Sequence, residues 1–596
     1  MKRTAHIVTM VVLASAGLLT AGYAQTNSWI SPTRGYWDDY TKWSLEVAPG
    51  NSQSVYITNA VSKTVTIDFF TSGYYPDAMT VSDLDLSAPA GATNTLELAD
   101  AGTDSALSVL DTVSVSAGGV LSLASSALSM HAVVNSFTNG VLSVDGVMVL
   151  NSNSLVMADS GLFVGVDSNA SGSCLVADGR LFLTNTATSA IGVSGSGRMI
   201  VSNGEVQAQS GFVIVGSGSG SQGALTVAGG DYTCSRLGRL ALGMETGAVG
   251  TVSVTSGSLI LTNALITVVG GNGIGELNLL TGTNYLGPLS IGSDTGGQGT
   301  FTVAGGVNNV QGAILLGSSP GATGTVWVTG GQITATNWPA YIGLYGSGLL
   351  TVSDGSWLGC AITVASEVNS RGAVNLEGGT MSLLARLTIG NCPEGGVGVV
   401  NVAGGGLYVT NAAHNAVIDV RNGQLNLNGG VLQADALIMT NACGLFVRDG
   451  GTLSVGSLVL DPNLDADGDG MPNGWEQSYG LDPLNPADAN VDTDGDGFTN
   501  LQEYQAGTDP TNSASAFRIV AIAQADDDMR ISWTAVGGKR YVLQTTAGDS
   551  GSFSNGFVDL NPAYTAPGTG EVVMTVLHPG AATGSPARFY RVRLVP

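Results

Sequence analysis

The sequence predicts an all-β protein organised around a right-handed parallel β-helix, a solenoid whose coils of about 25 residues stack on one another. Three features predict it: a glycine period, an apolar-polar alternation of period two, and recurrent tight turns. The glycines that open a short apolar run are 24 to 27 residues apart, at Gly172, Gly197, Gly223, Gly250, Gly275, Gly299, Gly324, Gly348, Gly372, Gly398 and Gly423.

Each opening glycine is followed by a segment with strand alternation, such as Phe301-Thr302-Val303. Many units contain a Gly-Gly turn and close on Ile-Gly or Leu-Gly, which leaves room for three short strands per coil. β-branched residues are abundant and no apolar stripe with helical spacing occurs. We therefore expect Val254, Val303 and Val402 to point into a shared apolar core.

Residues 1–24 have the pattern of a secretory signal peptide. Lys2 and Arg3 precede a short apolar run, and small residues lead to a cleavage position near Ala24. An uncleaved anchor helix is the alternative. No other apolar run is long enough to cross a membrane, so the mature chain is expected to have no transmembrane segment and to be secreted or displayed at the cell surface.

Residues 25–50 concentrate large aromatic side chains. These are Trp29, Tyr36, Trp37, Tyr40 and Trp43. An open solenoid end exposes unpaired strand edges, so we expect these residues to form an N-terminal cap; a platform that stacks on sugars is the alternative. The run of residues 35–44 resembles the Trp-rich segment that precedes the repeats of autotransporter-type passenger proteins.

Residues 51–460 are assigned to the β-helix, with a less regular period before Thr112. The repeats resemble those of autotransporter passenger domains and related exported β-helix proteins, which supports the architecture and leaves the activity open. Asn375, Asn401 and Asn426 occupy equivalent outward positions on three consecutive coils. They predict a ladder of hydrogen-bonded amides; a strip that contacts glycans is the alternative.

The charge balance restricts the partners. The chain has 45 acidic and 20 basic residues and a formal net charge of −25. A surface so poor in cations releases few counter-ions from phosphates, which excludes nucleic acid and anionic membranes. Glycans and components of the envelope or matrix are the partners we consider.

The five cysteines do not have the spacing of a metal site. Cys392 and Cys443 share a phase of the repeat but lie two coils apart, and Cys234 and Cys360 lie five coils apart. Since a disulfide needs Cα atoms within roughly 7 Å, we expect mostly free thiols packed as small apolar side chains.

The solenoid has few candidates for catalysis. Asp354 and Glu377 fall on adjacent coils without a third acid, and His131 and His414 stand alone. We expect no enzymatic activity. A carbohydrate-active β-helix enzyme, either a polysaccharide lyase or a hydrolase, is the alternative, because such enzymes use paired or clustered carboxylates.

The strongest local signal lies in residues 461–512, where two segments fit a twelve-residue calcium loop position by position. Carboxylates stand at positions 1, 3 and 5, glycine at 6, a backbone carbonyl at 7 and a glutamate at 12. The first set is Asp465, Asp467, Asp469, Met471 and Glu476, and the second is Asp492, Asp494, Asp496, Phe498 and Glu503. Position 9 is Asn473 or Asn500, which lowers the charge of each site.

This segment resembles thrombospondin type 3 and EF-hand-like repeats of exported bacterial proteins. The resemblance implies Ca²⁺ as the cofactor and carries the family's ligand roles onto the residues just named. An acidic disordered linker is the alternative.

In residues 513–596 the sequence pattern changes, and short segments of apolar-polar alternation follow one another at the spacing of strands in a β-sandwich. They resemble fibronectin type III or immunoglobulin-like modules, which implies a binding or anchoring role. Together these features predict a secreted or cell-surface structural or adhesive rod protein, monomeric or laterally associating, with a calcium-stabilised joint to its C-terminal module.

Overall fold

The structure, a computed structural model, describes residues 24–595 except for 52, 75–78, 131–140, 160, 185–187, 210, 235–238, 262–264, 549–555, 561 and 584–586. It confirms the predicted fold class: a parallel β-solenoid of about 16 turns with coils of about 25 residues, followed by antiparallel sheets. Strands make up 55% of the chain and helices 5%. The chain divides into two compact units, residues 1–211 and 212–596, each described here by itself.

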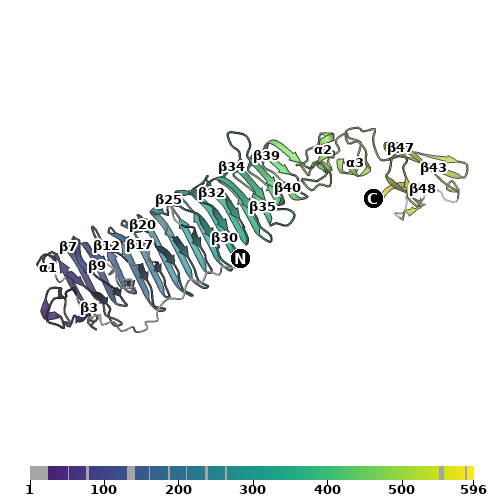
Figure 1. Cartoon of the computed structure of the whole chain (residues 1–596). Coiled ribbons are helices and arrows are strands. Elements are labelled where there is room, and N and C mark those ends of the chain that lie inside the picture. Colours follow the sequence, from purple (N-terminus) through teal and green to yellow (C-terminus); the bar gives the residue numbers. More distant parts are fainter. Residues whose placement is uncertain are drawn as a thin grey trace, which may run out of the picture. The chain divides into compact units, whose positions relative to one another are not determined.

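The described part of the first unit consists mainly of parallel strands, with a short helix and a 3-10 turn near its N-terminal end (Figure 1). Its elements are β1 (Gln25–Ser28), β2 (Gly35–Tyr36), η1 (Tyr40–Lys42), β3 (Gln53–Ile57), β4 (Lys63–Asp68), α1 (Phe69–Tyr74), β5 (Thr80–Val81), β6 (Asp83–Leu86), β7 (Asn94–Val109), β8 (Val113–Val115), β9 (Gly119–Met130), β10 (Val141–Val144), β11 (Val147–Leu150), β12 (Leu155–Ala158), β13 (Gly161–Val164), β14 (Ser171–Val176), β15 (Arg180–Leu183), β16 (Ser189–Ile191), β17 (Ser196–Val201) and β18 (Glu205–Ala208).

Three tryptophans form a buried cluster near the N-terminal end of this unit. Trp29, Trp37 and Trp43 are buried, and the Trp43 ring lies edge-on to both of the others, with centroids 5.0 and 5.2 Å away. The Trp43 indole N–H donates to the Trp37 carbonyl at 2.7 Å. Tyr36 and Tyr40 are exposed, so only the indoles contribute to the buried cluster.

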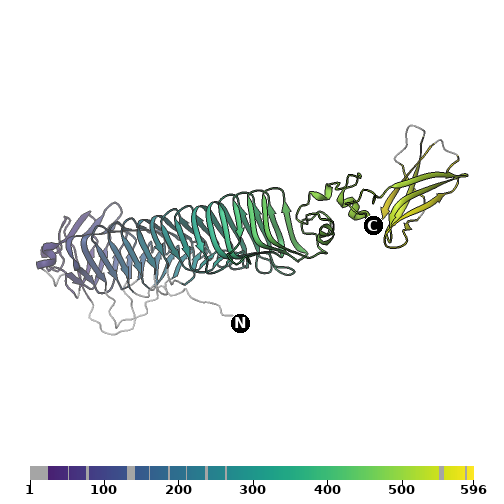
Figure 2. The same cartoon turned by 90° about the horizontal axis from the view of Figure 1, so that it is seen from above.

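The second unit contains parallel coils over residues 212–460, stacked one on the next in Figure 2. Its solenoid strands are β19 (Phe212–Val215), β20 (Gln222–Cys234), β21 (Arg239–Leu242), β22 (Val249–Ile260), β23 (Thr267–Val269), β24 (Ile274–Leu279), β25 (Thr283–Leu286), β26 (Leu289–Ile291), β27 (Gln298–Val303), β28 (Val307–Val310), β29 (Ile314–Leu316), β30 (Thr323–Ala335), β31 (Ala340–Ile342), β32 (Ser347–Val364), β33 (Arg371–Leu376), β34 (Thr380–Ile389), β35 (Val397–Val402), β36 (Gly406–Val409), β37 (Val417–Val420), β38 (Asn422–Leu427), β39 (Val431–Met439), β40 (Cys443–Arg448) and β41 (Thr452–Leu460).

The register confirms the glycine period. Gly299 pairs with Gly324, and the same column continues through Gly348, Gly372, Gly398 and Gly423. Val254, Val303 and Val402 have no exposed surface, as predicted from the alternation. Burial of such side chains stabilises the stack by about 1.5–3 kcal/mol each.

The Ile-Gly closing pair has a clear structural role. Gly343 has a φ of +77°, and a Cβ there would lie 2.1 Å from the carbonyl oxygen of Arg371 on the next coil. Only glycine combines this left-handed turn with such a close approach.

The predicted amide ladder is present on the outer face. The Asn401 side chain donates to Asn375 at 2.8 Å, and Asn426 donates to Asn401 at 2.7 Å. Because parallel strands bring the three positions into register, each amide bonds to the same atom type on the coil before it.

The prediction for Cys392 and Cys443 was wrong, since the two residues form a disulfide with Cα atoms 6.3 Å apart. The phase argument placed both residues at equivalent positions of regular coils, two coils apart. Cys392 lies instead in a seven-residue loop, 390–396, between β34 and β35, whereas the next equivalent connection, from β37 to β38, is the single residue Arg421. The shortened turn leaves the loop free to reach the coil beyond. Cys174, Cys234 and Cys360 are free thiols, as predicted.

After the solenoid come two short helices, α2 (Asn473–Tyr479) and α3 (Asn500–Ala506), with the turn η3 (Asp488–Asn490) between them. The C-terminal strands are β42 (Ile519–Ala525), β43 (Asp528–Val536), β44 (Arg540–Gly548), β45 (Val558–Asp559), β46 (Tyr564–Thr565), β47 (Glu571–His578) and β48 (Ala587–Val595).

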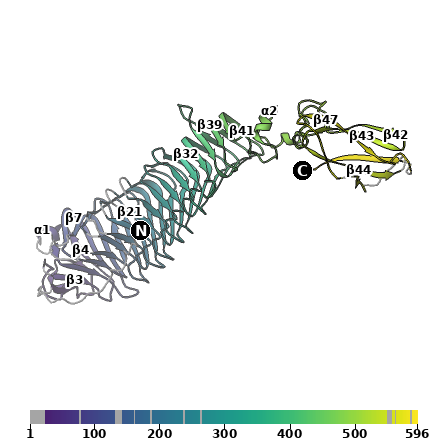
Figure 3. The same ribbon diagram turned by 45° about the vertical axis from the view of Figure 1, so that its right-hand side comes forward.

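These strands form a three-stranded and a four-stranded antiparallel sheet (Figure 3). Ile531 and Trp533 of β43 and Tyr541 and Leu543 of β44 share the buried core. The Tyr541 hydroxyl also accepts a hydrogen bond from the Val536 N–H at 2.7 Å.

In the described part of the chain, no helix is both long and apolar enough to cross a bilayer.

Candidate metal centre

The two acidic loops of residues 465–476 and 492–503 have the same backbone geometry. Each makes a sharp turn at the sixth position, where Gly470 has a φ of +97° and Gly497 a φ of +101°. Each then enters a helix, α2 or α3, that carries the final glutamate in its first turn. The helices end on Gly480 and Gly507 in the left-handed conformation, a common helix terminus.

In both loops, the first aspartate holds the turn. Asp465 accepts from the N–H groups of Gly468 and Gly470 at 2.7 and 2.9 Å, and Asp492 accepts from Gly495 and Gly497, both at 2.8 Å. The loops therefore repeat one hydrogen-bond network, which the identical spacing of aspartate and glycine produces.

The third and fifth positions use one carboxylate oxygen for the loop and leave the other without a partner. Asp469 Oδ1 accepts from Met471 N–H at 2.8 Å, and Asp496 Oδ1 accepts from Phe498 N–H at 2.9 Å. Asp467 and Asp494 accept from the N–H two residues later in the same way. The Oδ2 atoms of all four are buried and lack a hydrogen-bond partner.

The glutamates at position 12 are the most deeply buried acids of the segment. Glu476 has no exposed surface, and neither of its carboxylate oxygens has a partner. Glu503 is 1% exposed; one oxygen accepts from the Thr508 hydroxyl at 3.2 Å and the other has no partner. Buried carboxylate oxygens without donors are costly unless a cation neutralises them.

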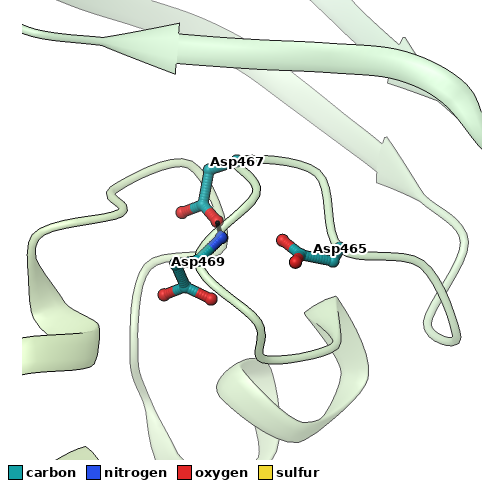
Figure 4. Close-up of side chains that lie close together, drawn as sticks. All are labelled: Asp465, Asp467 and Asp469. Atoms are coloured by element: carbon teal, nitrogen blue, oxygen red, sulfur yellow. Dashed lines mark hydrogen bonds between the residues drawn. The ribbon is translucent and has the colours of Figure 1, made fainter. Parts of the chain in front are cut away.

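The carboxylates lie close enough together to share an ion. Figure 4 shows the side chains of Asp465, Asp467 and Asp469 converging within the first loop, and one oxygen from each falls in a group with all atoms within 4.8 Å of one another. Asp492, Asp494 and Asp496 form the equivalent group in the second loop. Hard oxygen donors of this kind suit Ca²⁺.

The electrostatics follow from this crowding. Burial, reinforced by repulsion from neighbouring carboxylates, raises the pKa of Glu476 to about 9 and that of Asp467 to about 8. Burial likewise raises the pKa of Asp469 to about 6 and that of Glu503 to about 7. At pH 7 without a cation, Glu476 and Asp467 therefore hold protons that a bound ion would displace.

The structure adds one residue that the loop pattern does not include. Asp488, at the start of η3, lies in a second group with Asp469 and Glu476. Its Oδ2 accepts from the Asp482 N–H at 3.0 Å, whereas its Oδ1 is buried without a partner. Burial also raises the pKa of Asp488. In the sequence, the only feature that indicates Asp488 is that it is an acidic residue between the two repeats.

The asparagines at position 9 stabilise the loops through side-chain hydrogen bonds. Asn473 is fully buried, donates to the Asp461 carbonyl at 2.8 Å and accepts from the Ala466 N–H at 3.0 Å. Asn500 donates to the Asp488 carbonyl at 2.8 Å and accepts from the Thr493 hydroxyl at 2.9 Å. Their amides are thus occupied within the protein and tie the residues just before each loop to the helix that follows it.

The other described candidates belong to none of these ligand groups. Asp354 accepts a hydrogen bond from the next N–H along the chain, and His414 is largely exposed beside Asp435. His131 lies outside the described residues. Within the described part of the chain, every group of three or more potential metal ligands belongs to residues 465–496.

A family model described as the bacterial TSP3 repeat matches residues 465–486 and 492–513. Repeats of this family bind calcium, are structural rather than catalytic and are typical of extracellular proteins. The comparisons with curated proteins and with solved structures gave no match. The matched repeats and the parallel coils together indicate a β-helix repeat protein with calcium-binding segments.

Proposed function

We propose that the chain is an exported structural or adhesive protein in which two calcium ions stiffen the segment between the solenoid and the C-terminal sheets. The observation that carries this proposal is the set of buried carboxylate oxygens without partners in both loops. The proposed partners of the protein are glycans or components of the cell envelope or matrix.

The first ion would be held by Asp465, Asp467, Asp469, the carbonyl of Met471 and Glu476, with Asp488 as an additional carboxylate. The second would be held by Asp492, Asp494, Asp496, the carbonyl of Phe498 and Glu503. These sets supply the six or more oxygen ligands that Ca²⁺ prefers.

Contacts at both ends of the segment support a mechanical role. On the solenoid side, the Phe446 N–H donates to the Ala466 carbonyl at 2.8 Å, so the first loop is hydrogen-bonded to β40. On the other side, Lys539 Nζ donates to the Gln505 carbonyl, and the Ser515 hydroxyl donates to Glu571 of β47. Calcium that orders the loops would therefore order both connections.

Limited proteolysis of the full chain tests this role. We expect cleavage within residues 461–512 to be slow in calcium and fast in a chelator, because without the ions the buried carboxyls lose their only partners and gain by opening to water. Cleavage at equal rates in both conditions would refute the proposal.

A further inference from the structure

The solenoid carries a groove of about 820 Å³ on its outer face, formed by β30, β32, β33, β35 and two loops. The outward side chains of Thr325, Leu349, Ala373 and Val399 form its floor, in register on four consecutive coils. At roughly 4.8 Å per coil, the floor extends about 14 Å along the stack. Ligand sites commonly have volumes of roughly 300–1,000 Å³.

Two loops form the walls of the groove and hold each other. In the loop of residues 365–370, the Ser370 hydroxyl donates to the Glu367 carbonyl at 2.7 Å and is buried. In loop 390–396, Asn391 donates from its side chain to the Ser366 carbonyl at 3.3 Å. The Cys392–Cys443 disulfide ties this second loop to the coil beyond. The groove is therefore held in shape before any ligand arrives, which lowers the entropic cost of binding.

The charged side chains that line the groove are Arg371 and Glu394, and both are exposed. Among the fully described residues 265–460, every other arginine is ion-paired: Arg386 and Arg421 with Asp419, and Arg448 with Asp482. Arg371 has no side-chain partner among the described residues. The groove thus offers one free cation and one acid, balanced in charge, in a protein whose net charge is −25.

This lining selects the class of ligand. An extended peptide has no strand edge to join, because β32 and β33 are paired on both sides. A nucleic acid would meet a single cation. A saccharide fits both the apolar floor and the pair of opposite charges. Its C–H faces can cover Leu349, Ala373 and Val399. Its hydroxyls can bond to Arg371, to Glu394 and to the hydroxyl of Thr325. Trp327, two residues beyond Thr325 on the same face of β30, is 37% exposed and extends the apolar surface.

We infer that this groove binds an uncharged oligosaccharide, with Arg371 and Glu394 bonding to its hydroxyls. The inference deepens the proposed role as a glycan-contacting surface protein. It is independent of the calcium loops, since none of the lining residues lies in them.

Native affinity electrophoresis of the full chain tests the groove, in gels that contain a soluble β-glucan, a galactomannan or an arabinoxylan, with polygalacturonate as the charged probe. We expect retardation in at least one neutral polymer, in calcium and in chelator alike. Persistence in chelator separates this result from failure of the calcium proposal.

Two variants define the site. Arg371→Ala should weaken binding about tenfold or more, because it removes charge-assisted hydrogen bonds. Arg386→Ala is the matched control, which removes the same charge and leaves Asp419 paired with Arg421; it should keep affinity within about twofold of the original. The double variant Cys392→Ser, Cys443→Ser should bind more weakly because a groove wall is released. The inference is overturned by retardation only in polygalacturonate, by no retardation, or by equal losses in the two arginine variants.

Discussion

Replacing Glu476 by glutamine should have opposite effects on the first loop with and without calcium. In the calcium-bound protein, the variant loses a carboxylate that closes the site. In the calcium-free protein, it removes a buried acid with no hydrogen-bond partner.

The size of the calcium-free effect follows from the carboxyl's titration. Burial raises the pKa of Glu476 from 4.5 to about 9. At pH 7 the unfolded carboxyl is ionised and the folded one is protonated, so folding takes up a proton at a cost of about 3 kcal/mol. Glutamine does not titrate, and the calcium-free variant should therefore be more stable by up to about 3 kcal/mol.

The calcium-bound effect has the opposite sign. Calcium at a hundred times its Kd stabilises a folded site by about 2.7 kcal/mol, and most of this is lost when the bidentate ligand is absent. Hydrogen exchange of α2 amides, measured in calcium and in chelator, reports both effects. The variant should show slower exchange than the original in chelator and little further protection in calcium.

Asp449→Asn is the control for the charge change, because Asp449 is exposed and lies outside both loops. It should keep the full calcium-dependent protection. If Glu476→Gln kept the same protection as the original chain, Glu476 would not be a ligand and the reasoning would fail.

The other predictions concern the stack and the ion sites. Val402→Asp buries an unpaired charge and should destabilise the solenoid by about 4 kcal/mol or more, and an unchanged melting temperature would contradict the register. Asn401→Ala removes two amide hydrogen bonds and should cost about 1–3 kcal/mol in denaturant titrations; no shift of the midpoint would argue against the ladder. Because burial raises the folded pKa of Glu476 and of Asp467, the calcium-free loop loses stability as the pH rises from about 4 to 9. Calcium affinity, measured by titration calorimetry from pH 5 to 8, should therefore increase with pH, and a flat profile would count against proton displacement. Asp488→Asn should weaken the first site and leave the second unchanged, and equal weakening of both would show that Asp488 acts only through general charge.

The parts of the fold that local patterns determine could be predicted from the sequence. Strand alternation and the glycine period specify which side chains face inward, so Val303 and Val402 were placed correctly. The twelve-residue loop pattern also placed Asp465, Asp467 and Asp469 together, because all ligands in such a loop come from one short segment.

Features that depend on unequal connections could not be predicted in this way. The Cys392–Cys443 disulfide depends on a seven-residue loop next to a one-residue turn at Arg421, and the period contains no information about that difference. The groove beside Arg371 arises from the same long loop. Asp488 joins the first site from the turn between the two repeats, outside the loop pattern.

Isothermal titration of the calcium-free full chain with Ca²⁺ is the most direct test of the central claim. We predict two bound ions, with dissociation constants of roughly 10⁻⁴–10⁻³ M, and no binding after the double substitution Glu476→Gln and Glu503→Gln. A chain that binds no calcium in this range, or a double variant that binds as the original does, would contradict it.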